Sequence, residues 1–113
     1  MKIKDINKLE KIANNIRIGI IEQVYNAQSG HPGGSLSATD ILTVLYFNQM
    51  NIDENKPSAQ ERDRFILSKG HCSPALYATL AEKGYFPKEK LSTFRKFGGE
   101  LQGHPDMKNI RGV

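Results

Sequence analysis

The chain has 113 residues, of which 38% are hydrophobic and 25% are charged, and it contains no tryptophan. This length allows one hydrophobic core of ordinary domain size. No stretch approaches the ~18 consecutive apolar residues of a membrane-spanning helix, so we expect no membrane insertion. Residues 1–11 lack the apolar stretch of a signal peptide, and the single cysteine, Cys72, cannot form an intrachain disulfide. We therefore expect a cytoplasmic protein.

The net charge of +4 comes from 16 Lys and Arg against 12 Asp and Glu. Such an excess could indicate a surface that binds a polyanion or an anionic small molecule. The cations are spread along the chain, and the two segments that hold eight of them, 2–11 and 88–96, each have the pattern of an amphipathic helix. Solvated helix faces explain this arrangement better, and we expect no nucleic-acid partner.

The first predicted helix covers residues 5–28. Gly19 lies inside it and costs up to ~1 kcal/mol relative to Ala, so close packing could require it. A Ser-Gly pair ends the helix, and the Pro-Gly-Gly sequence at 32–34 is expected to keep the next loop from being helical. The helix itself is predicted from apolar residues that recur every three or four positions: Leu9, Ile12, Ile16, Ile20, Val24 and Ala27.

A second helix is predicted to begin at Ser37. Its hydroxyl can cap the first turn, and Asp40 resembles the acidic partner of a capping box. The polar stretch 51–60 is predicted to be a loop. Apolar side chains on nearly every side of the second helix predict that it is buried: Ile41, Leu42, Val44, Leu45 and Phe47.

One strand is predicted at residues 64–68, where a short apolar run is bounded by charge and glycine. A third helix is predicted over 73–84 with Ser73 as its cap, and Pro87 should open a short fourth helix. A lone strand has no partner for its backbone groups and is not a stable unit. The chain therefore fits a mostly helical part of an α/β domain whose strand needs neighbours from elsewhere.

Three histidines, His31, His71 and His104, each follow a glycine in a predicted loop. Loops on a rigid scaffold are where catalytic groups concentrate, and glycine lets the backbone approach a ligand closely. Imidazole, with an unperturbed pKa of ~6.5, exchanges protons near neutral pH. The three histidines could thus serve a reaction on hydroxyls and carbonyls. Taken singly, each could also be an ordinary hydrogen-bonded loop histidine.

Two other interpretations involve the same residues. Three histidines with an open position could bind catalytic zinc, although no two of them have the close spacing that often marks such a site. Cys72 follows His71 and could form a Cys-His nucleophile pair. Adjacent residues usually point apart, which is poor geometry for proton transfer, so a small residue in a tight turn is the simpler interpretation of Cys72.

Three segments, 29–37, 62–71 and 102–106, together resemble the amino-terminal part of transketolase in order and separation. That family uses thiamine diphosphate to transfer two-carbon ketol units between sugar phosphates, a reaction of the pentose phosphate pathway. The resemblance implies a transferase with an α/β thiamine-diphosphate-binding fold, in which helices flank a parallel sheet. Residues 1–113 would be the amino-terminal part of the diphosphate-binding domain, and that domain would be incomplete.

The resemblance also implies roles for four residues. His31, His71 and His104 would be catalytic. His31 would move protons on substrate hydroxyls, and His104 would hydrogen-bond the oxygens of the donor sugar. His71 would bind the cofactor near its diphosphate, and Gly34 would lie near the thiazolium ring.

Other parts of the family's machinery are expected outside this chain. They include the Gly-Asp-Gly segment and following Asn that hold the diphosphate and Mg²⁺, so no metal ligand is expected here, and the glutamate that activates the cofactor. We therefore expect the partners to be complementary transketolase segments or a complementary polypeptide, with a homodimer when complete, and little activity from residues 1–113 alone. The alternative is a degenerate or truncated fragment that acts at most as an interaction module.

Overall fold

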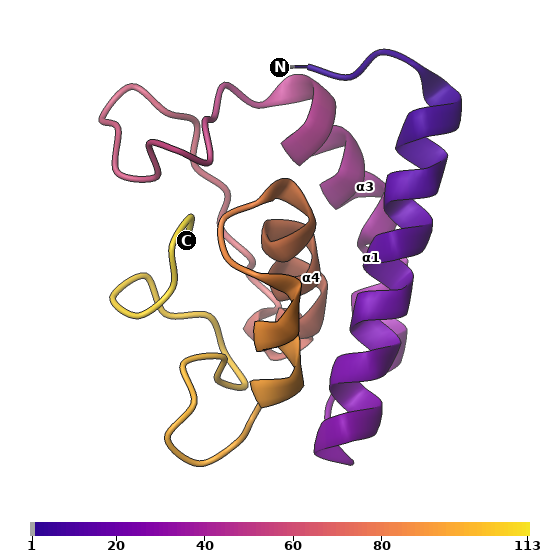
Figure 1. Cartoon of the computed structure of the whole chain (residues 1–113), viewed down its shortest axis with the longest axis vertical. Helices are drawn as coiled ribbons and strands as arrows, with labels where there is room; N and C mark the ends of the chain where they lie inside the picture. The colour runs from indigo at the N-terminus through magenta and orange to yellow at the C-terminus, as the bar shows by residue number, and fades with distance from the viewer. Residues whose placement is uncertain (1) are drawn as a thin grey trace.

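The longest element is α1, Ile6–Ala27, which runs along one side of the molecule (Figure 1). The computed structural model describes residues 2–113. Asp5 caps the helix, because its Oδ1 accepts a hydrogen bond from the backbone N–H of Asn7 at 2.9 Å. The first predicted helix is confirmed. Gly19 does serve close packing, since a Cβ there would lie 3.1 Å from the Cβ of Ala78.

Two short helices follow: α2, Pro32–Ser37, and α3, Thr39–Val44, which continues into the π-helical η1, Leu45–Gln49. The prediction that 32–34 is a loop and that a helix begins at Ser37 is therefore wrong. Proline is favourable at the first position of a helix, where its missing N–H has no intrahelical partner to lose. The Ser37 hydroxyl caps nothing and instead donates to the carbonyl oxygen of Gly34 at 3.0 Å.

The second predicted helix is also less buried than its composition indicates. Ile41 is 65% exposed and Val44 is 43% exposed, whereas Leu42 is buried. One face of α3 packs on α1 and α4. The ion pair between Arg17 and Asp40, 2.7 Å apart, joins α1 to α3 at the edge of that contact.

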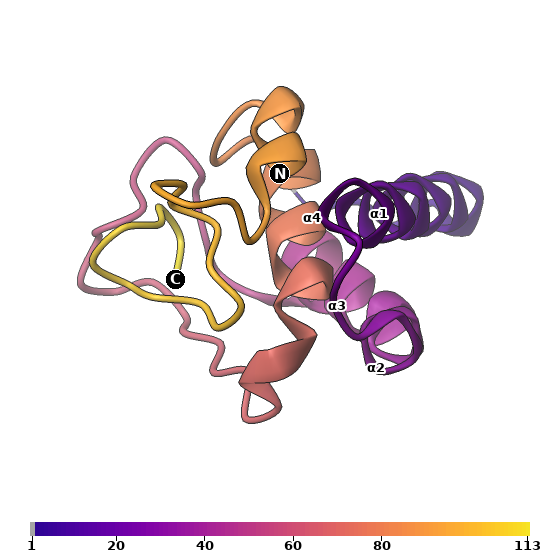
Figure 2. The ribbon, with the colours of Figure 1, turned by 90° about the horizontal axis from the view of Figure 1, so that it is seen from below.

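The central element is α4, Ser73–Lys83, in which every residue from Ser73 to Ala81 is buried. A 3-10 turn, η2 (Gly70–Cys72), leads into it, and Gly84 ends it with a φ of 105°. The prediction of this helix is confirmed, and the predicted fourth helix is the 3-10 helix η3, Lys88–Thr93. Figure 2 shows α4 between α1 on one side and the C-terminal segment on the other.

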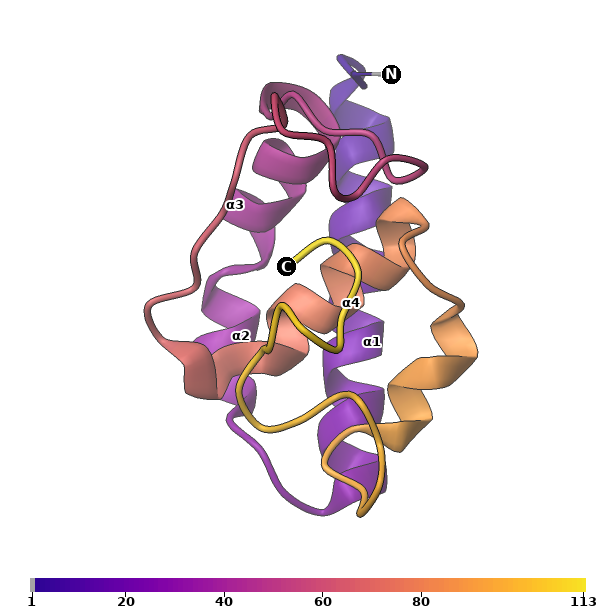
Figure 3. The same ribbon diagram turned by 90° about the vertical axis from the view of Figure 1, so that its left-hand side faces the viewer.

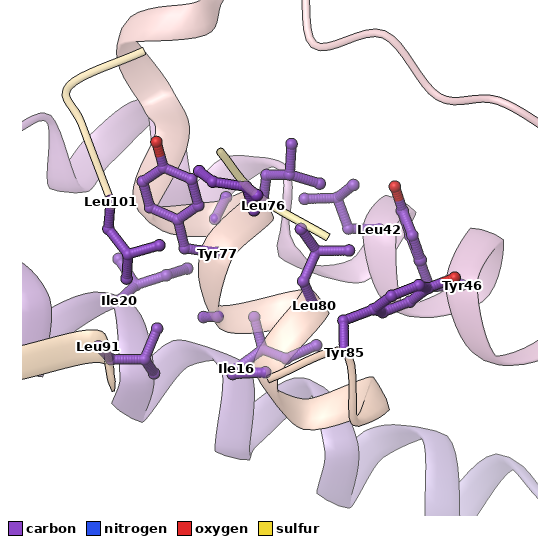
Figure 4. Close-up of a cluster of buried hydrophobic side chains, with 14 of the residues drawn as sticks. Ile16, Ile20, Leu42, Tyr46, Leu76, Tyr77, Leu80, Tyr85, Leu91 and Leu101 are labelled. Carbon is purple, nitrogen blue, oxygen red and sulfur yellow. The ribbon is translucent and has the colours of Figure 1, made fainter. Parts of the chain in front are cut away.

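The core forms where α4 meets α1 and the C-terminal segment (Figure 4). Burying a Leu, Ile or Phe side chain stabilises a fold by ~1.5–3 kcal/mol relative to leaving it exposed, so this cluster is the main source of stability. Its largest members are Ile16, Ile20, Leu42, Leu76, Tyr77, Leu80, Phe94 and Leu101. Figure 3 shows the C-terminal segment crossing in front of α4 and so covering its second side.

The predicted strand at 64–68 is not formed, and no strand is present anywhere in residues 2–113. Within that range no backbone–backbone hydrogen bond involves residues 64–68. Phe65 and Leu67 pack against the core, whereas Ile66 between them is 85% exposed. A strand requires a neighbouring chain segment for its N–H and C=O groups, and this part of the chain supplies none. The expected parallel sheet is thus absent from these residues.

None of the helices in residues 2–113 has the length and apolar composition needed to cross a membrane.

Candidate functional site

His71 lies in η2, directly before α4. The turn is closed by a hydrogen bond from the N–H of Cys72 to the carbonyl oxygen of Lys69 at 2.8 Å. Residues 72–81 are buried, but the side chain of His71 is exposed. The start of the most buried helix therefore fixes the backbone of His71 while its imidazole faces outward.

His31 is the residue that precedes α2, and its carbonyl oxygen accepts the N–H of Ser35 at 3.2 Å. The ring of His31 meets the ring of His71 edge to face, with centroids 4.8 Å apart and an interplanar angle of 80°. Gly30, just before it, has a φ of 140°, a conformation that side chains other than glycine rarely adopt. The bend at Gly30 thus directs His31 toward His71.

His104 reaches the same turn from the C-terminal segment. Its ring lies directly over Gly70, because a Cβ built on Gly70 would be only 2.6 Å from Nδ1 of His104 and 3.3 Å from its Cε1. Gly70 is next to His71 in the chain. The three predicted histidines, from three separate loops, therefore meet around η2, and all three side chains are exposed.

Lys69 ties α2 to this turn, a role that the sequence pattern did not indicate. Its ammonium group donates to the carbonyl oxygen of Gly34 at 2.8 Å and to the hydroxyl of Ser37 at 3.2 Å. A weaker contact, from the hydroxyl of Ser35 to the carbonyl oxygen of Cys72 at 3.4 Å, supports the same junction. These bonds hold the segment that follows His31 against the segment that carries His71.

Gly34 packs against Cys72. A Cβ on Gly34 would be 2.4 Å from Sγ of Cys72, so the thiol occupies the space that a side chain would need. Cys72 is 1% exposed, and this burial fits a small residue in a turn rather than a reactive nucleophile. Gly34 must therefore lack a side chain for α2 to pack against the turn that carries His71.

Two hydroxyl groups of α4 hold the loop that carries His104. Ser73 donates to the carbonyl oxygen of Gly103 at 2.8 Å, and Tyr77 donates to the carbonyl oxygen of Gln102 at 2.5 Å. The sequence predicts Ser73 only as the cap of α4, and no pattern indicates a role for Tyr77. Both side chains instead connect the central helix to the third histidine loop.

A cavity of about 460 Å³ opens beside the cluster, and Gly70 and His104 form part of its wall. Most of its remaining lining is apolar and includes Phe65, Ile66 and Leu76. Among residues 2–113, no group of three or more His, Cys, Asp or Glu side chains is arranged to hold a metal ion. The structure therefore does not support the hypothesis, based on the presence of three histidines, that they form a zinc site.

Comparisons with known proteins identify the family of this chain. A family model described as "Transketolase, thiamine diphosphate binding domain" matches residues 8–113. The 6-deoxy-6-sulfo-D-fructose transketolase subunit SqwG of Clostridium sp. (strain MSTE9) is 49% identical over 105 residues, which are 93% of this chain and 38% of that protein. One subunit of the apulose-4-phosphate transketolase of Phocaeicola vulgatus is 44% identical over 102 residues, which are 90% of this chain and 36% of that protein.

Among solved structures, transketolase from Leishmania mexicana matches with a TM-score of 0.88 and 32% identity, over 100% of this chain and 16% of that one. The chain thus spans well under half the length of each of these relatives. The family model covers nearly all of this chain, and the structural match extends over its whole length. The chain belongs to the transketolase thiamine diphosphate binding domain family.

Proposed function

We propose that residues 1–113 form the amino-terminal part of the diphosphate-binding domain of a transketolase that transfers two-carbon ketol units between sugar phosphates. The observation that carries this proposal is the meeting of the three histidine loops, with the rings of His31 and His71 4.8 Å apart and His104 over Gly70. Family membership supports it. The names of two relatives, both subunits of transketolases, support a complete enzyme built from more than one polypeptide.

The histidines suit the proton movements of such a transfer. Breaking and forming a bond between a carbonyl carbon and a hydroxyl-bearing carbon requires protons to leave and reach oxygen atoms, and imidazole can do both. In this proposal His31 moves protons on substrate hydroxyls, and His104 hydrogen-bonds the oxygens of the donor sugar. His71 would help to hold the cofactor near its diphosphate. The exposure of all three rings leaves them accessible to such a substrate.

The residues present fit thiamine diphosphate at two positions. A side chain at Gly34 would collide with Cys72 and one at Gly70 would collide with His104, so the turn that carries His71 packs closely against both neighbouring segments. His71 and Gly34 are the residues we assign to the cofactor. When bound, thiamine diphosphate would supply the carbanion stabilisation that no protein side chain provides. On the family resemblance, we assign the Mg²⁺ ligands to the complementary part of the enzyme.

The unpaired segment 64–68 supports a larger domain around this chain. Its backbone groups have no partners in residues 2–113, and Ile66 exposes an apolar side chain next to the cavity. We propose that strands from the complementary transketolase part pair with it and complete a parallel sheet. Sugar phosphates, this complement and a second copy in a dimer are the proposed partners.

Activity of the complemented enzyme tests the proposal. The chain would be co-expressed with the polypeptide that completes its domain and with the remaining transketolase segments, and ketol transfer would be followed with thiamine diphosphate, Mg²⁺ and sugar phosphates. Each of His31→Ala, His71→Ala and His104→Ala should lower kcat/KM by ~100-fold or more. Lys108→Ala, at an exposed position outside the cluster, is the matched control and should keep normal turnover.

Near-normal turnover in His71→Ala would refute the role of that histidine. Calorimetric titration of thiamine diphosphate into the complemented protein distinguishes the second candidate function. A complemented protein that binds no cofactor and shows no turnover would favour an interaction module over an enzyme part.

A further inference from the structure

We propose that Tyr77, assisted by Ser73, is a positioning residue that sets the location of His104. The catalytic consequence of this inference rests on the proposed function, whereas the positioning of His104 does not depend on it. Tyr77 and Ser73 lie one helical turn apart on α4, so both side chains leave the same face of the helix. Both are fully buried, and Figure 4 shows Tyr77 next to Leu101 of the C-terminal segment.

The hydroxyls of Tyr77 and Ser73 donate hydrogen bonds to two consecutive peptide carbonyl groups. Tyr77 donates to the carbonyl oxygen of Gln102 at 2.5 Å, and Ser73 donates to the carbonyl oxygen of Gly103 at 2.8 Å. These are the two residues immediately before His104. One step further back, the carbonyl oxygen of Leu101 accepts the N–H of Arg95 at 2.8 Å. The loop is therefore held at each of the three residues that precede the histidine.

The residue that follows His104 completes the restraint. Pro105 limits the backbone of the residue before it to extended conformations. With its preceding carbonyl groups fixed by α4 and its own backbone restricted by Pro105, His104 has few ways to place its ring. The observed placement is over Gly70, the residue before His71.

The hydroxyl of Tyr77 is held in place by packing of its ring, and it stays protonated and able to donate a hydrogen bond. Its ring packs edge to face on Phe94, with centroids 6.1 Å apart, so the hydroxyl is held by two elements of the core. Burial raises the pKa of Tyr77 above its ordinary value of 10.0, so the hydroxyl keeps its proton at neutral pH. The other two buried tyrosines differ, because within residues 2–113 the hydroxyls of Tyr46 and Tyr85 make no hydrogen bond to the protein.

The nuclear Overhauser effect between the His104 ring protons and the Hα protons of Gly70 tests the proposal in the chain itself. We expect this signal in the wild type and its loss in Tyr77→Phe, which keeps the aromatic ring and removes only the hydroxyl. The signal between the rings of His31 and His71 should persist and serves as the internal reference. Tyr85→Phe is the matched control and should retain both signals.

Three outcomes would overturn the proposal: no His104–Gly70 signal in the wild type, the same signal in a folded Tyr77→Phe chain, or its loss in Tyr85→Phe. If Tyr77→Phe unfolds the chain, Ser73→Ala alone decides. These signals need neither cofactor nor sugar phosphate. A chain with the expected signals but no ketol transfer after complementation would therefore refute the proposed function and leave the positioning role intact.

The complemented enzyme offers a second readout, which a general loss of stability would not reproduce. Tyr77→Phe should lower kcat/KM by ~10- to 100-fold in the wild-type background, because a displaced histidine no longer meets its substrate. In the His104→Ala background the same substitution should have little further effect. An equal loss in both backgrounds would show that Tyr77 does not act through His104.

Discussion

Replacing Gly34 by alanine should destabilise the chain, because the new methyl group would collide with the thiol of Cys72. The resulting contact of 2.4 Å is far inside van der Waals distance, and Cys72 is 1% exposed, so its sulfur has little room to move. The backbone of Gly34 does not oppose alanine, since its φ is not positive. Overpacking costs ~1–3 kcal/mol, and alanine regains up to ~1 kcal/mol of helix propensity. We expect a net loss of about 1–2 kcal/mol.

Two further variants separate the collision from the change of residue type. Gly33 is the neighbour of Gly34 in α2, and nothing lies within 4 Å of a Cβ built on it. Gly33→Ala should therefore be neutral or stabilising by up to ~1 kcal/mol. Cys72→Ala removes the sulfur, after which the Cβ of residue 34 would be 3.8 Å from the Cβ of residue 72, an ordinary contact.

The assay is urea unfolding followed by far-ultraviolet circular dichroism for the wild type, the single variants and the double variant. Gly34→Ala combined with Cys72→Ala should be more stable than the sum of the single effects by ~1–2 kcal/mol. If the two effects add within ~0.5 kcal/mol, the thiol is not what excludes a side chain from position 34, and the packing argument fails.

Buried tyrosines and Lys69 give two further predictions. Above pH ~10 the unfolded chain releases phenolic protons that the folded chain retains, so the free energy of unfolding should fall by up to ~1.4 kcal/mol per pH unit for each such tyrosine. Urea titrations between about pH 9 and pH 11 measure this slope, and Tyr85→Phe should flatten it. Lys69→Met should lower the free energy of unfolding by ~1 kcal/mol at about pH 7 and weaken the Overhauser effect between the His31 and His71 rings, whereas Lys108→Met should do neither. The tyrosines of the first of these predictions, the alkaline loss of stability, are those whose pKa burial raises above 10.0: Tyr46, Tyr77 and Tyr85.

Each of these two predictions has a clear contrary result. An alkaline slope that is equal in the wild type and in Tyr85→Phe would show that this phenol ionises as freely in the folded chain as in the unfolded one. An unchanged ring signal in Lys69→Met would show that the ammonium group does not hold the first two histidine loops together.

The long amphipathic pattern was enough to predict α1, because a stripe at helical spacing over more than five turns has no competing interpretation. Gly84 likewise marked the end of α4 correctly, since its positive φ suits glycine. Short segments were less predictable. At 32–37 the glycines indicated a loop, but Pro32 begins a helix that packs on α1 and α4 and that Lys69 holds in place.

The candidate site was likewise predictable only in part. The three histidines were identified by the glycine that precedes each of them and by the family resemblance. Their supporting residues carried no comparable signal, because Lys69, Ser73 and Tyr77 bond to backbone carbonyl groups that are 25 to 35 positions away in the chain. Every residue has a backbone carbonyl group, so a sequence pattern cannot indicate which residue will accept such a hydrogen bond.

The sequence by itself therefore determined the two principal helices and the three loops that carry imidazoles. Tertiary structure alone decided that these loops meet at η2, that Gly34 and Gly70 must lack side chains, and that the extended apolar segment at 64–68 has no partner in residues 2–113. The physical reason is the range of the interactions. Helix periodicity and turn preferences act between near neighbours, whereas steric exclusion, backbone pairing and buried hydrogen bonds depend on segments that only folding brings together.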